Sequence, residues 1–325
     1  MFINFADGKN EGGMILSRKW RQNPYKTRPS PERMSKGRLP LKWRLYNGAY
    51  RARLFLKNRF SSARKGETGM AGLDFKGKKA IVFGIATDKS IGYAIAKKLN
   101  DLGCKLAIGY QDRAADWVKP LLAQFDDPLV GLSDACSDET MDSFYKMVQE
   151  QWGEVDYLIH SIAFAKRQHL QGRFIDVDRR GWQVSQEVSA FSLPDFLRRT
   201  APLMKSGGSC VTLTFMGSER VFPNYNVMGV CKAALEASVR YAANDLGQQN
   251  IRVNAISAGP IPTLAASAIQ GFDDMLMEFV KKAPLKRLIT QEEVANTALF
   301  LLSDMSSGIT GEVIHVDGGY NIMGI

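Results

Sequence analysis

A tyrosine and a lysine, Tyr225 and Lys232, stand seven residues apart in the segment 224–232 (NYNVMGVCK). A helix turns by about 100° per residue, so this spacing places the two side chains within about 20° of each other on one helical face. A phenol beside a lysine ammonium is suited to donate a hydrogen bond to a developing oxyanion, because the cation favours negative charge nearby. The pair predicts an active site, although two such residues also share a helical face by chance.

A second candidate for chemistry is the glycine turn 84–92 (GIATDKSIG), which follows an apolar run and leads into a helical pattern that Ser90 is suited to cap. Such a junction directs backbone N–H groups and a helix N-terminus at a pyrophosphate. The two glycines lack the strict G-x-G-x-x-G spacing, so the turn alone is equally compatible with a simple tight turn. Together with Tyr225 and Lys232 it predicts a dinucleotide site.

The end of the second apolar run indicates which dinucleotide is bound. An acidic residue there accepts hydrogen bonds from the ribose of NAD, whereas an arginine accommodates the 2′-phosphate of NADP. Here the neutral Gln111 stands at this place, with Asp112 and Arg113 acting in opposite directions. We expect NADH in preference to NADPH.

These residues require a scaffold of β-α-β units, and the alternation of short apolar runs with helical periodicity from Lys79 onward predicts one. The pattern predicts a single doubly wound, Rossmann-like α/β domain with a seven-stranded parallel sheet. The strands are expected at 80–84, 105–110, 129–133, 155–160, 209–215, 252–257 and 313–316. Helices are expected near 91–102, 141–152, 182–201, 227–246 and 292–302, the last opened by a capping-box pattern at Thr290.

Composition and cysteine spacing exclude several classes of protein. With 45% hydrophobic residues the chain can bury a large core. The four cysteines are far apart in the sequence, so neither a disulfide framework nor a zinc site is expected, and reduced thiols suit the cytoplasm. No apolar run is long enough to span a membrane, and no secretory signal begins the chain.

The formal charge of +10 is concentrated in residues 1–69, which hold 17 basic and 4 acidic residues, whereas residues 70–325 have a net charge of −3. The domains are therefore expected as a basic extension at 1–69 and an enzyme domain at 70–325. A basic segment with interspersed aromatic residues is compatible with nucleic-acid or membrane-surface binding, or with a transit peptide. The simpler interpretation, a disordered tail upstream of a working start at Met70, is favoured.

The residues from about Phe75 to the end resemble the short-chain dehydrogenase/reductase superfamily, and within it the bacterial enoyl-[acyl-carrier-protein] reductases (NADH) of fatty-acid synthesis. Ordinary members have a Tyr-x3-Lys pattern; here Met228 occupies that tyrosine position, and the Tyr-x6-Lys spacing is that of the enoyl reductases. The resemblance also rests on the segments 84–92, 160–165 (HSIAFA), 224–229 (NYNVMG), 252–261 (RVNAISAGPI), 263–266 (TLAA) and 308–319 (GITGEVIHVDGG). Residues 1–69 have no counterpart in it.

The longer spacing has a chemical interpretation. Three further positions along a helix displace the tyrosine by about 4.5 Å. Reduction of a conjugated enoyl thioester places hydride on the β-carbon, so the developing enolate oxygen lies two carbons further from it than in ketone reduction. We expect the displaced tyrosine to serve this more distant oxygen.

The resemblance implies a role for each matching residue. Tyr225 would donate to the enolate oxygen, and Lys232 would hold the nicotinamide ribose. The cofactor would contact Gly84, Ser90, Ile91, Gln111, Asp134, Ala135, Ile162, Lys232, Ile261, Pro262, Thr263, Leu264 and Ala265. The substrate would contact Ala165, Tyr225, Phe272 and Met275, although the two last side chains are equally compatible with packing of an amphipathic helix.

The sequence departs from the family pattern at three places. Phe215 occupies a catalytic position where many bacterial relatives have a second tyrosine, so no phenol donates there; we interpret this as a subfamily feature. Pro262 stands where arginine is frequent. Segment 270–274 (QGFDD) is acidic where relatives often present basic residues to an acidic carrier protein, so Arg167, Lys281 with Lys282, or the basic extension would replace them, or a different carrier is used.

The resemblance thus implies an NADH-dependent oxidoreductase that converts trans-2-enoyl thioesters of acyl-carrier protein, or of another thioester carrier, into saturated thioesters. Hydride goes to the β-carbon, Tyr225 stabilises the enolate, and a proton arrives from solvent through the Lys232 network. A cytoplasmic homotetramer is also implied. The alternatives are a ketoreductase or dienoyl reductase on the same fold, or a weakly active nucleotide-binding paralogue whose basic extension carries its function.

Overall fold

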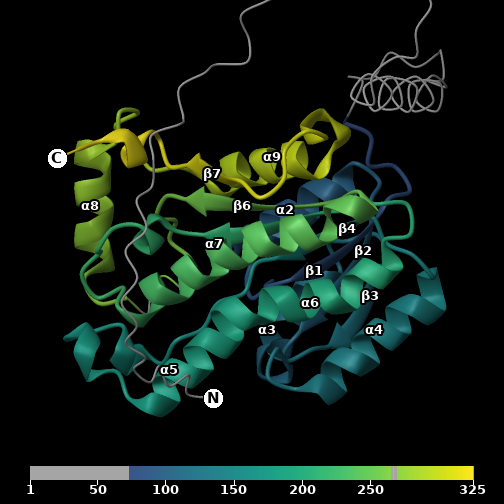
Figure 1. Cartoon of the computed structure of the whole chain (residues 1–325), viewed down its shortest axis with the longest axis horizontal. Helices are drawn as coiled ribbons and strands as arrows, with labels where there is room; N and C mark the ends of the chain where they lie inside the picture. The colour runs from purple at the N-terminus through teal and green to yellow at the C-terminus, as the bar shows by residue number, and fades with distance from the viewer. Residues whose placement is uncertain (1–72, 265, 267–268, 325) are drawn as a thin grey trace, which may run out of the picture. The chain divides into compact units, whose positions relative to one another are not determined.

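Seven parallel strands form one sheet in the order β3-β2-β1-β4-β5-β6-β7 (Figure 1). The strands are β1 Lys79–Phe83, β2 Lys105–Tyr110, β3 Leu129–Leu132, β4 Tyr157–His160, β5 Gly208–Thr214, β6 Ile251–Ala258 and β7 Val313–Val316. The computed structural model describes residues 73–264, 266 and 269–324, within the unit Thr68–Ile325. The basic extension predicted at 1–69 lies outside the described residues.

The central strands are almost continuously buried because both faces of the sheet are covered. In β1 four of the five residues are buried, as expected for a parallel strand between two helical layers. The helices are α2 Ile91–Asp101, α3 Ala115–Leu122, α4 Asp138–Trp152, α5 Arg179–Gln186, α6 Ser192–Thr200, α7 Val227–Leu246, α8 Phe272–Lys282 and α9 Gln291–Leu302.

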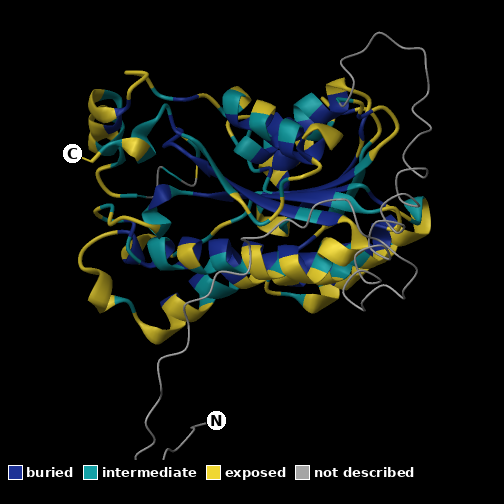
Figure 2. Ribbon diagram, turned by 45° about the horizontal axis from the view of Figure 1, so that its top comes forward, coloured by how far each residue is buried: buried dark blue, intermediate teal, exposed yellow. Residues whose placement is uncertain are grey.

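Two apolar clusters lie on the two sides of the sheet. Helices α2 and α9 contribute side chains such as Leu99 and Leu302 to one cluster. Helices α4, α6 and α7 contribute Phe144, Phe196 and Leu235 to the other. Buried residues accordingly follow the strands and the inner helix faces, and exposed residues the outer faces (Figure 2). The predicted doubly wound fold with seven parallel strands is confirmed.

Three helical predictions need correction. The helix expected over 182–201 consists of α5, a π-helical turn at Glu187–Phe191, and α6. The helices α3 and α8 are missing from the predicted elements. In α3 the eight residues include Pro120 and offer little periodicity. The predicted capping box is present: the Thr290 hydroxyl accepts from the N–H of Glu293, and the Glu293 carboxylate accepts from the N–H of Thr290.

The four cysteines are free thiols. Cys104, Cys210 and Cys231 are buried and free, and Cys136 is exposed and free. Within the described ranges, no three histidine, cysteine or acidic side chains gather as a metal site. None of the helices in those ranges combines the length and apolar character that crossing a membrane requires.

Candidate active site

The strand order reverses between β1 and β4, and the first site element, the turn after β1, lies at this switch point. Gly84 has φ +104°, and a Cβ built on it would lie 2.0 Å from the carbonyl oxygen of Ser161, which follows β4. Any side chain at residue 84 would therefore separate the turn from β4. The close approach explains why glycine stands at the start of the predicted dinucleotide turn.

Ser90 does not cap α2 as predicted. It occupies the N-cap position, but its hydroxyl accepts from the backbone N–H groups of Ala86 and Thr87, at 3.1 and 3.0 Å. The hydroxyl thus fixes the turn, and α2 begins without a side-chain cap. A helix N-terminus whose backbone N–H groups have no side-chain cap is suited to bind an anionic group.

The residues predicted around the adenosine follow β2 and β3, which are neighbours in the sheet. Gln111 accepts a 2.8 Å hydrogen bond from Nε of Arg113, whose guanidinium lies 5.2 Å from the centroid of the Phe164 ring. Asp134 accepts from the N–H of Cys136, and Ala135 packs against the α4–α6–α7 cluster. Arg113 is thereby held between Gln111 and the loop after β4.

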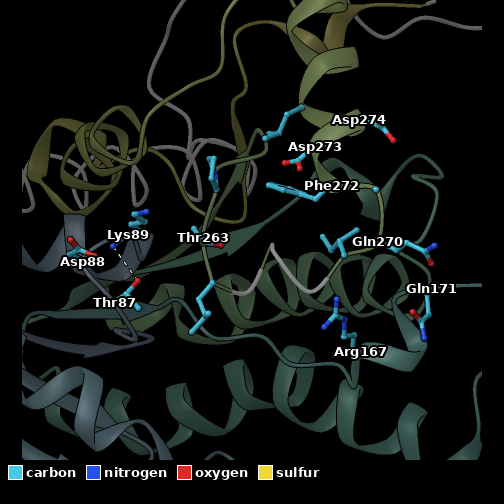
Figure 3. A pocket seen from close by; sticks show the side chains of 15 residues that line it. Thr87, Asp88, Lys89, Arg167, Gln171, Thr263, Gln270, Phe272, Asp273 and Asp274 are labelled. Atoms are coloured by element: carbon cyan, nitrogen blue, oxygen red, sulfur yellow. Dashed lines mark hydrogen bonds between the residues drawn. The ribbon is translucent and has the colours of Figure 1, made fainter.

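A cleft of about 1120 Å³ lies beside the glycine turn (Figure 3). Pro262, Thr263, Leu264 and Phe272 line it, as do Thr87 and Lys89. Met275 is not among the lining residues, although Leu276 is. Ala265, also predicted to contact the cofactor, lies outside the described residues. Ile261 and Ile91 pack with the α2–α9 cluster beneath the cleft.

The predicted position of Tyr225 on a helix is wrong. Helix α7 begins at Val227, and Tyr225 lies in the preceding turn between Asn224 (φ 66°) and Asn226 (φ 43°). Asn226, with positive φ, is the N-cap of α7, so neither the shared helical face nor the 4.5 Å displacement describes the relation of Tyr225 to Lys232. Asparagine is found at positive φ more often than most residues.

The same two asparagines connect the tyrosine turn to the loops at the cleft. The Asn224 amide donates to the carbonyl oxygen of Gln270 at 2.8 Å. The Asn226 amide donates to the carbonyl oxygens of Gln171 and Gly172, at 3.4 and 3.2 Å. Because Gln171 and Gln270 both line the cleft, these bonds fix Tyr225 relative to two of its walls.

Tyr225 is almost fully buried among apolar side chains. It belongs to a cluster with Leu170, Val227, Met228 and Cys231, against which Ala165, Phe215 and Ile269 pack. Ile269 also lines the cleft, so it connects this cluster to the open space. Burial raises the pKa of the phenol, and no other described residue forms a hydrogen bond with it. At neutral pH Tyr225 is a protonated donor without an acceptor in the described part of the chain.

Lys232 lies on α7 with only 6% of its surface exposed. Its ammonium donates to the carbonyl oxygen of Leu213 on β5 at 2.7 Å. Burial lowers the pKa of Lys232 to about 8, while the neighbouring charge of Glu236 opposes the shift. An ammonium has three donors, so further N–H groups remain for a ligand.

Glu236 was not identified as a site residue from the sequence. Its carboxylate is buried and accepts a 2.6 Å hydrogen bond from the hydroxyl of Thr214 on β5. Glu236 follows Lys232 by one helical turn, and this i,i+4 spacing was the available signal. The carboxylate therefore lies near the lysine, and its negative charge favours the protonated form of Lys232.

Two buried polar side chains position the loop after β4. His160 forms hydrogen bonds with the hydroxyls of Thr212 and Ser192, both at 2.8 Å, and burial lowers its pKa to about 3, so the ring is neutral and has a packing role. Ser189, in the π-helical turn, bonds with both the N–H and the carbonyl of Phe164. This fixes the loop that contains Ile162 and Ala165, a function of Ser189 with no signal in the sequence.

Comparison with known proteins decides the family. A family model described as Enoyl-(Acyl carrier protein) reductase matches residues 84–321. The chain belongs to this enoyl reductase family. Its membership confirms the predicted resemblance and the predicted enzyme class, an oxidoreductase.

Individual enoyl reductases agree with the family match. The enzyme of Synechocystis, named enoyl-[acyl-carrier-protein] reductase [NADH] FabI, is 47% identical over 257 residues, 78% of this chain and 100% of the relative. The crystal structure of the Bacillus cereus enoyl reductase with NADP+ and an indole naphthyridinone has a TM-score of 0.76 and 45% identity, covering 78% of this chain and 99% of that one. The Anaplasma phagocytophilum enzyme, crystallised with NAD, has a TM-score of 0.75 and 42% identity, covering 78% and 98%.

Proposed function

We propose that this enoyl reductase uses NADH to reduce trans-2-enoyl thioesters of acyl-carrier protein in fatty-acid biosynthesis, with Tyr225 and Lys232 as its catalytic residues. The observation that carries the proposal is the position of Tyr225: a buried phenol without an acceptor, fixed by Asn224 and Asn226 to two walls of a large cleft. The relatives named NADH-dependent enoyl reductases support the cofactor and the reaction.

The residues present fit a nicotinamide dinucleotide. The uncapped start of α2 suits the pyrophosphate, with Gly84, Ser90 and Ile91 shaping the turn. Gln111, Asp134 and Ala135 would hold the adenosine side, and Ile162 with residues 261–264 would hold the nicotinamide side. The remaining N–H groups of Lys232 bind the ribose hydroxyls. The Arg113 guanidinium donates to Gln111 and lies over the Phe164 ring, and the relatives named as NADH enzymes support NADH as the cofactor.

Bound NADH supplies the hydride that reduces the β-carbon of the enoyl thioester. Negative charge then develops on the thioester oxygen, where the Tyr225 phenol donates a hydrogen bond. The Lys232 ammonium lowers the energy of that charge, and water is excluded by the apolar cluster around Tyr225, which strengthens both interactions. A proton reaches the α-carbon from solvent by way of the Lys232 network. Ala165 and Phe272 contact the acyl chain, with Met275 placed in the flanking helix.

Phe215 has no donor, so all hydrogen bonding to the enolate falls to Tyr225 in this mechanism. The departure at Phe215 is then a subfamily feature rather than a sign of lost activity.

The organisation around the enzyme domain is also part of the proposal. Residues 1–69 form a basic extension and residues 70–325 the reductase domain; the family match, which begins at residue 84, supports this boundary. The enzyme works in the cytoplasm as a homotetramer, which the family resemblance supports.

Steady-state assays test the reaction. Purified protein is given crotonyl and longer 2-enoyl thioesters, 3-ketoacyl thioesters and 2,4-dienoyl thioesters, each with NADH and with NADPH. We expect the 2-enoyl thioesters with NADH to have the highest kcat/KM. Faster reduction of 3-ketoacyl or dienoyl thioesters, or NADH binding without turnover of any substrate, would refute the proposal.

A further inference from the structure

One surface beside the cleft has a charge opposite to that of the domain around it. Residues 166–182, which we name the α5 lip, comprise the later part of the loop after β4 and the start of α5, and contain five basic and two acidic residues. The domain from residue 70 onward is net negative. The lip is therefore a local concentration of positive charge in a net negative domain.

The two acidic residues of the lip are occupied by local contacts. Asp176 pairs with Arg173 at 2.6 Å, and Asp178 accepts from the N–H of Gly181 and lies 3.3 Å from His169. The other four cations of the lip are exposed and form no ion pair with any residue that the structure describes. These cations are Lys166, Arg167, Arg179 and Arg180. The lip therefore presents net positive charge to an incoming partner.

Apolar side chains accompany these cations on the same surface. Within a single copy of the chain, Ile175 is 73% exposed, Phe174 41% and Trp182 38%. The Phe174 and Trp182 rings contact each other with centroids 6.5 Å apart. Exposed aromatic and aliphatic side chains surrounded by arginines are typical of protein-binding surfaces.

The lip also forms one wall of the cleft. Arg167 and Gln171 line the cleft, and Figure 3 shows them on the far side from Asp88 and Lys89. The first turn of α8 supplies Asp273 and Asp274 to the same cleft. An acidic protein would be repelled by the start of α8 and attracted to the lip.

We propose that the α5 lip, residues 166–182, is the surface on which the acidic face of acyl-carrier protein docks to deliver its thioester. This inference rests on the proposed function, because it names the carrier of that substrate. Cations and exposed aromatics within one short segment match the acidic and apolar surface of such a carrier, and the adjoining cleft receives the acyl group.

The test uses the double variant Arg179→Glu with Arg180→Glu, neither of which lines the cleft. Glutamate in the first turn of a helix is favourable, so the variant should fold, as thermal unfolding will verify. Two assays compare crotonyl-acyl-carrier protein with crotonyl-N-acetylcysteamine, a neutral thioester without a protein. We expect the KM for the carrier thioester to rise at least tenfold and the KM for the small thioester to change less than twofold.

Two matched variants test whether the effect on the carrier KM depends on the positive charge of the lip and on its position. Arg179→Lys with Arg180→Lys keeps the charge and should retain most of the affinity for the carrier. Lys281→Glu with Lys282→Glu reverses two cations at the end of α8, outside the lip, and should change the KM for the carrier thioester less than twofold. A larger effect at α8 than at the lip would overturn the proposal.

Direct binding separates this proposal from the proposed reaction. Calorimetry measures association of the acyl-carrier protein with the full chain and with the lip variant, without turnover. Carrier binding that is lost in the variant supports docking even if no enoyl thioester is reduced. Equal binding by both proteins, while the small thioester is still reduced, refutes the docking surface alone. Preferential binding of anionic vesicles or RNA, lost in the same variant, also overturns the assignment.

Discussion

The rings of Phe215 and Tyr225 meet edge to face, with centroids 4.9 Å apart and an interplanar angle of 68°. Phe215 also contacts Phe222, at 4.8 Å. Edge-to-face packing of this kind restrains both rings. Phe215, which has no phenol, therefore makes a packing contact that restrains the orientation of Tyr225.

Phe215→Tyr and Phe215→Ala distinguish packing from proton donation. We expect Phe215→Tyr to keep kcat within about threefold, because the ring contacts persist. Phe215→Ala removes the ring and should lower kcat about tenfold, since Tyr225 then moves more freely. Steady-state kinetics with a crotonyl thioester measures both values. A large gain of kcat in Phe215→Tyr would contradict the packing role.

Tyr225→Phe removes the only donor assigned to the enolate oxygen. Loss of one such donor costs about 100- to 1000-fold in kcat, and we expect a decrease of this size. The affinity for NADH, followed by nucleotide fluorescence, should remain within twofold because the phenol is not assigned to the cofactor. If kcat falls less than tenfold, another group stabilises the enolate.

The pH dependence of kcat/KM should report on Lys232. Its pKa of about 8 predicts a decline above pH 8, as the ammonium loses its proton. The Glu236 carboxylate favours the charged lysine, so Glu236→Gln should lower the pKa of Lys232 and shift the decline below pH 8. Glu150→Gln, which changes an exposed carboxylate on α4, serves as control. Identical profiles for Glu236→Gln and the unchanged protein would refute the coupling.

Gly217→Ala tests the close approach beneath Tyr225. A Cβ at Gly217 would lie 2.4 Å from the Tyr225 ring, whereas a Cβ at Gly247 meets nothing within 4 Å. We expect Gly217→Ala to displace the ring and lower kcat at least tenfold. Gly247→Ala should leave kcat unchanged and preserve or slightly raise the thermal stability. Equal kcat values for the two variants would show that the turn containing Tyr225 shifts to accommodate the added methyl group without loss of activity.

Arg199→Met tests a charge network around the buried Arg199 side chain, which connects α4 to α6. The Arg199 side chain is 6% exposed and binds Asp138, Asp142 and Asp195. Its loss leaves the buried Asp195 poorly compensated, so unfolding in urea should show a loss of about 3 kcal/mol. Arg198→Met removes a cation that also pairs with Asp195 but is 66% exposed, and should cost less than about 1 kcal/mol. Similar losses of unfolding free energy in both variants would contradict the expectation that the buried Arg199 contributes more than the exposed Arg198.

Local patterns in the sequence were sufficient for the strands of the scaffold and for most of its long helices. The seven apolar runs became the seven strands, and the Thr290 capping box begins α9 as expected. The charge split between residues 1–69 and the rest is likewise a property of the sequence alone. These features depend on each residue and its near neighbours, because periodicity and capping act within one or two turns.

The tertiary structure decided how the site residues act. Tyr225 leaves the helix because Asn224 and Asn226 bond to loops 46 and 54 residues away, at Gln270 and Gly172. Ser90 serves the turn rather than the helix, and Thr214 binds Glu236 behind Lys232 because β5 lies against α7. Such contacts join segments that only the strand order brings together, and a one-dimensional pattern of residue types contains no record of that proximity. The sequence by itself therefore determined which residues could react, and the packing of distant segments decided where they stand.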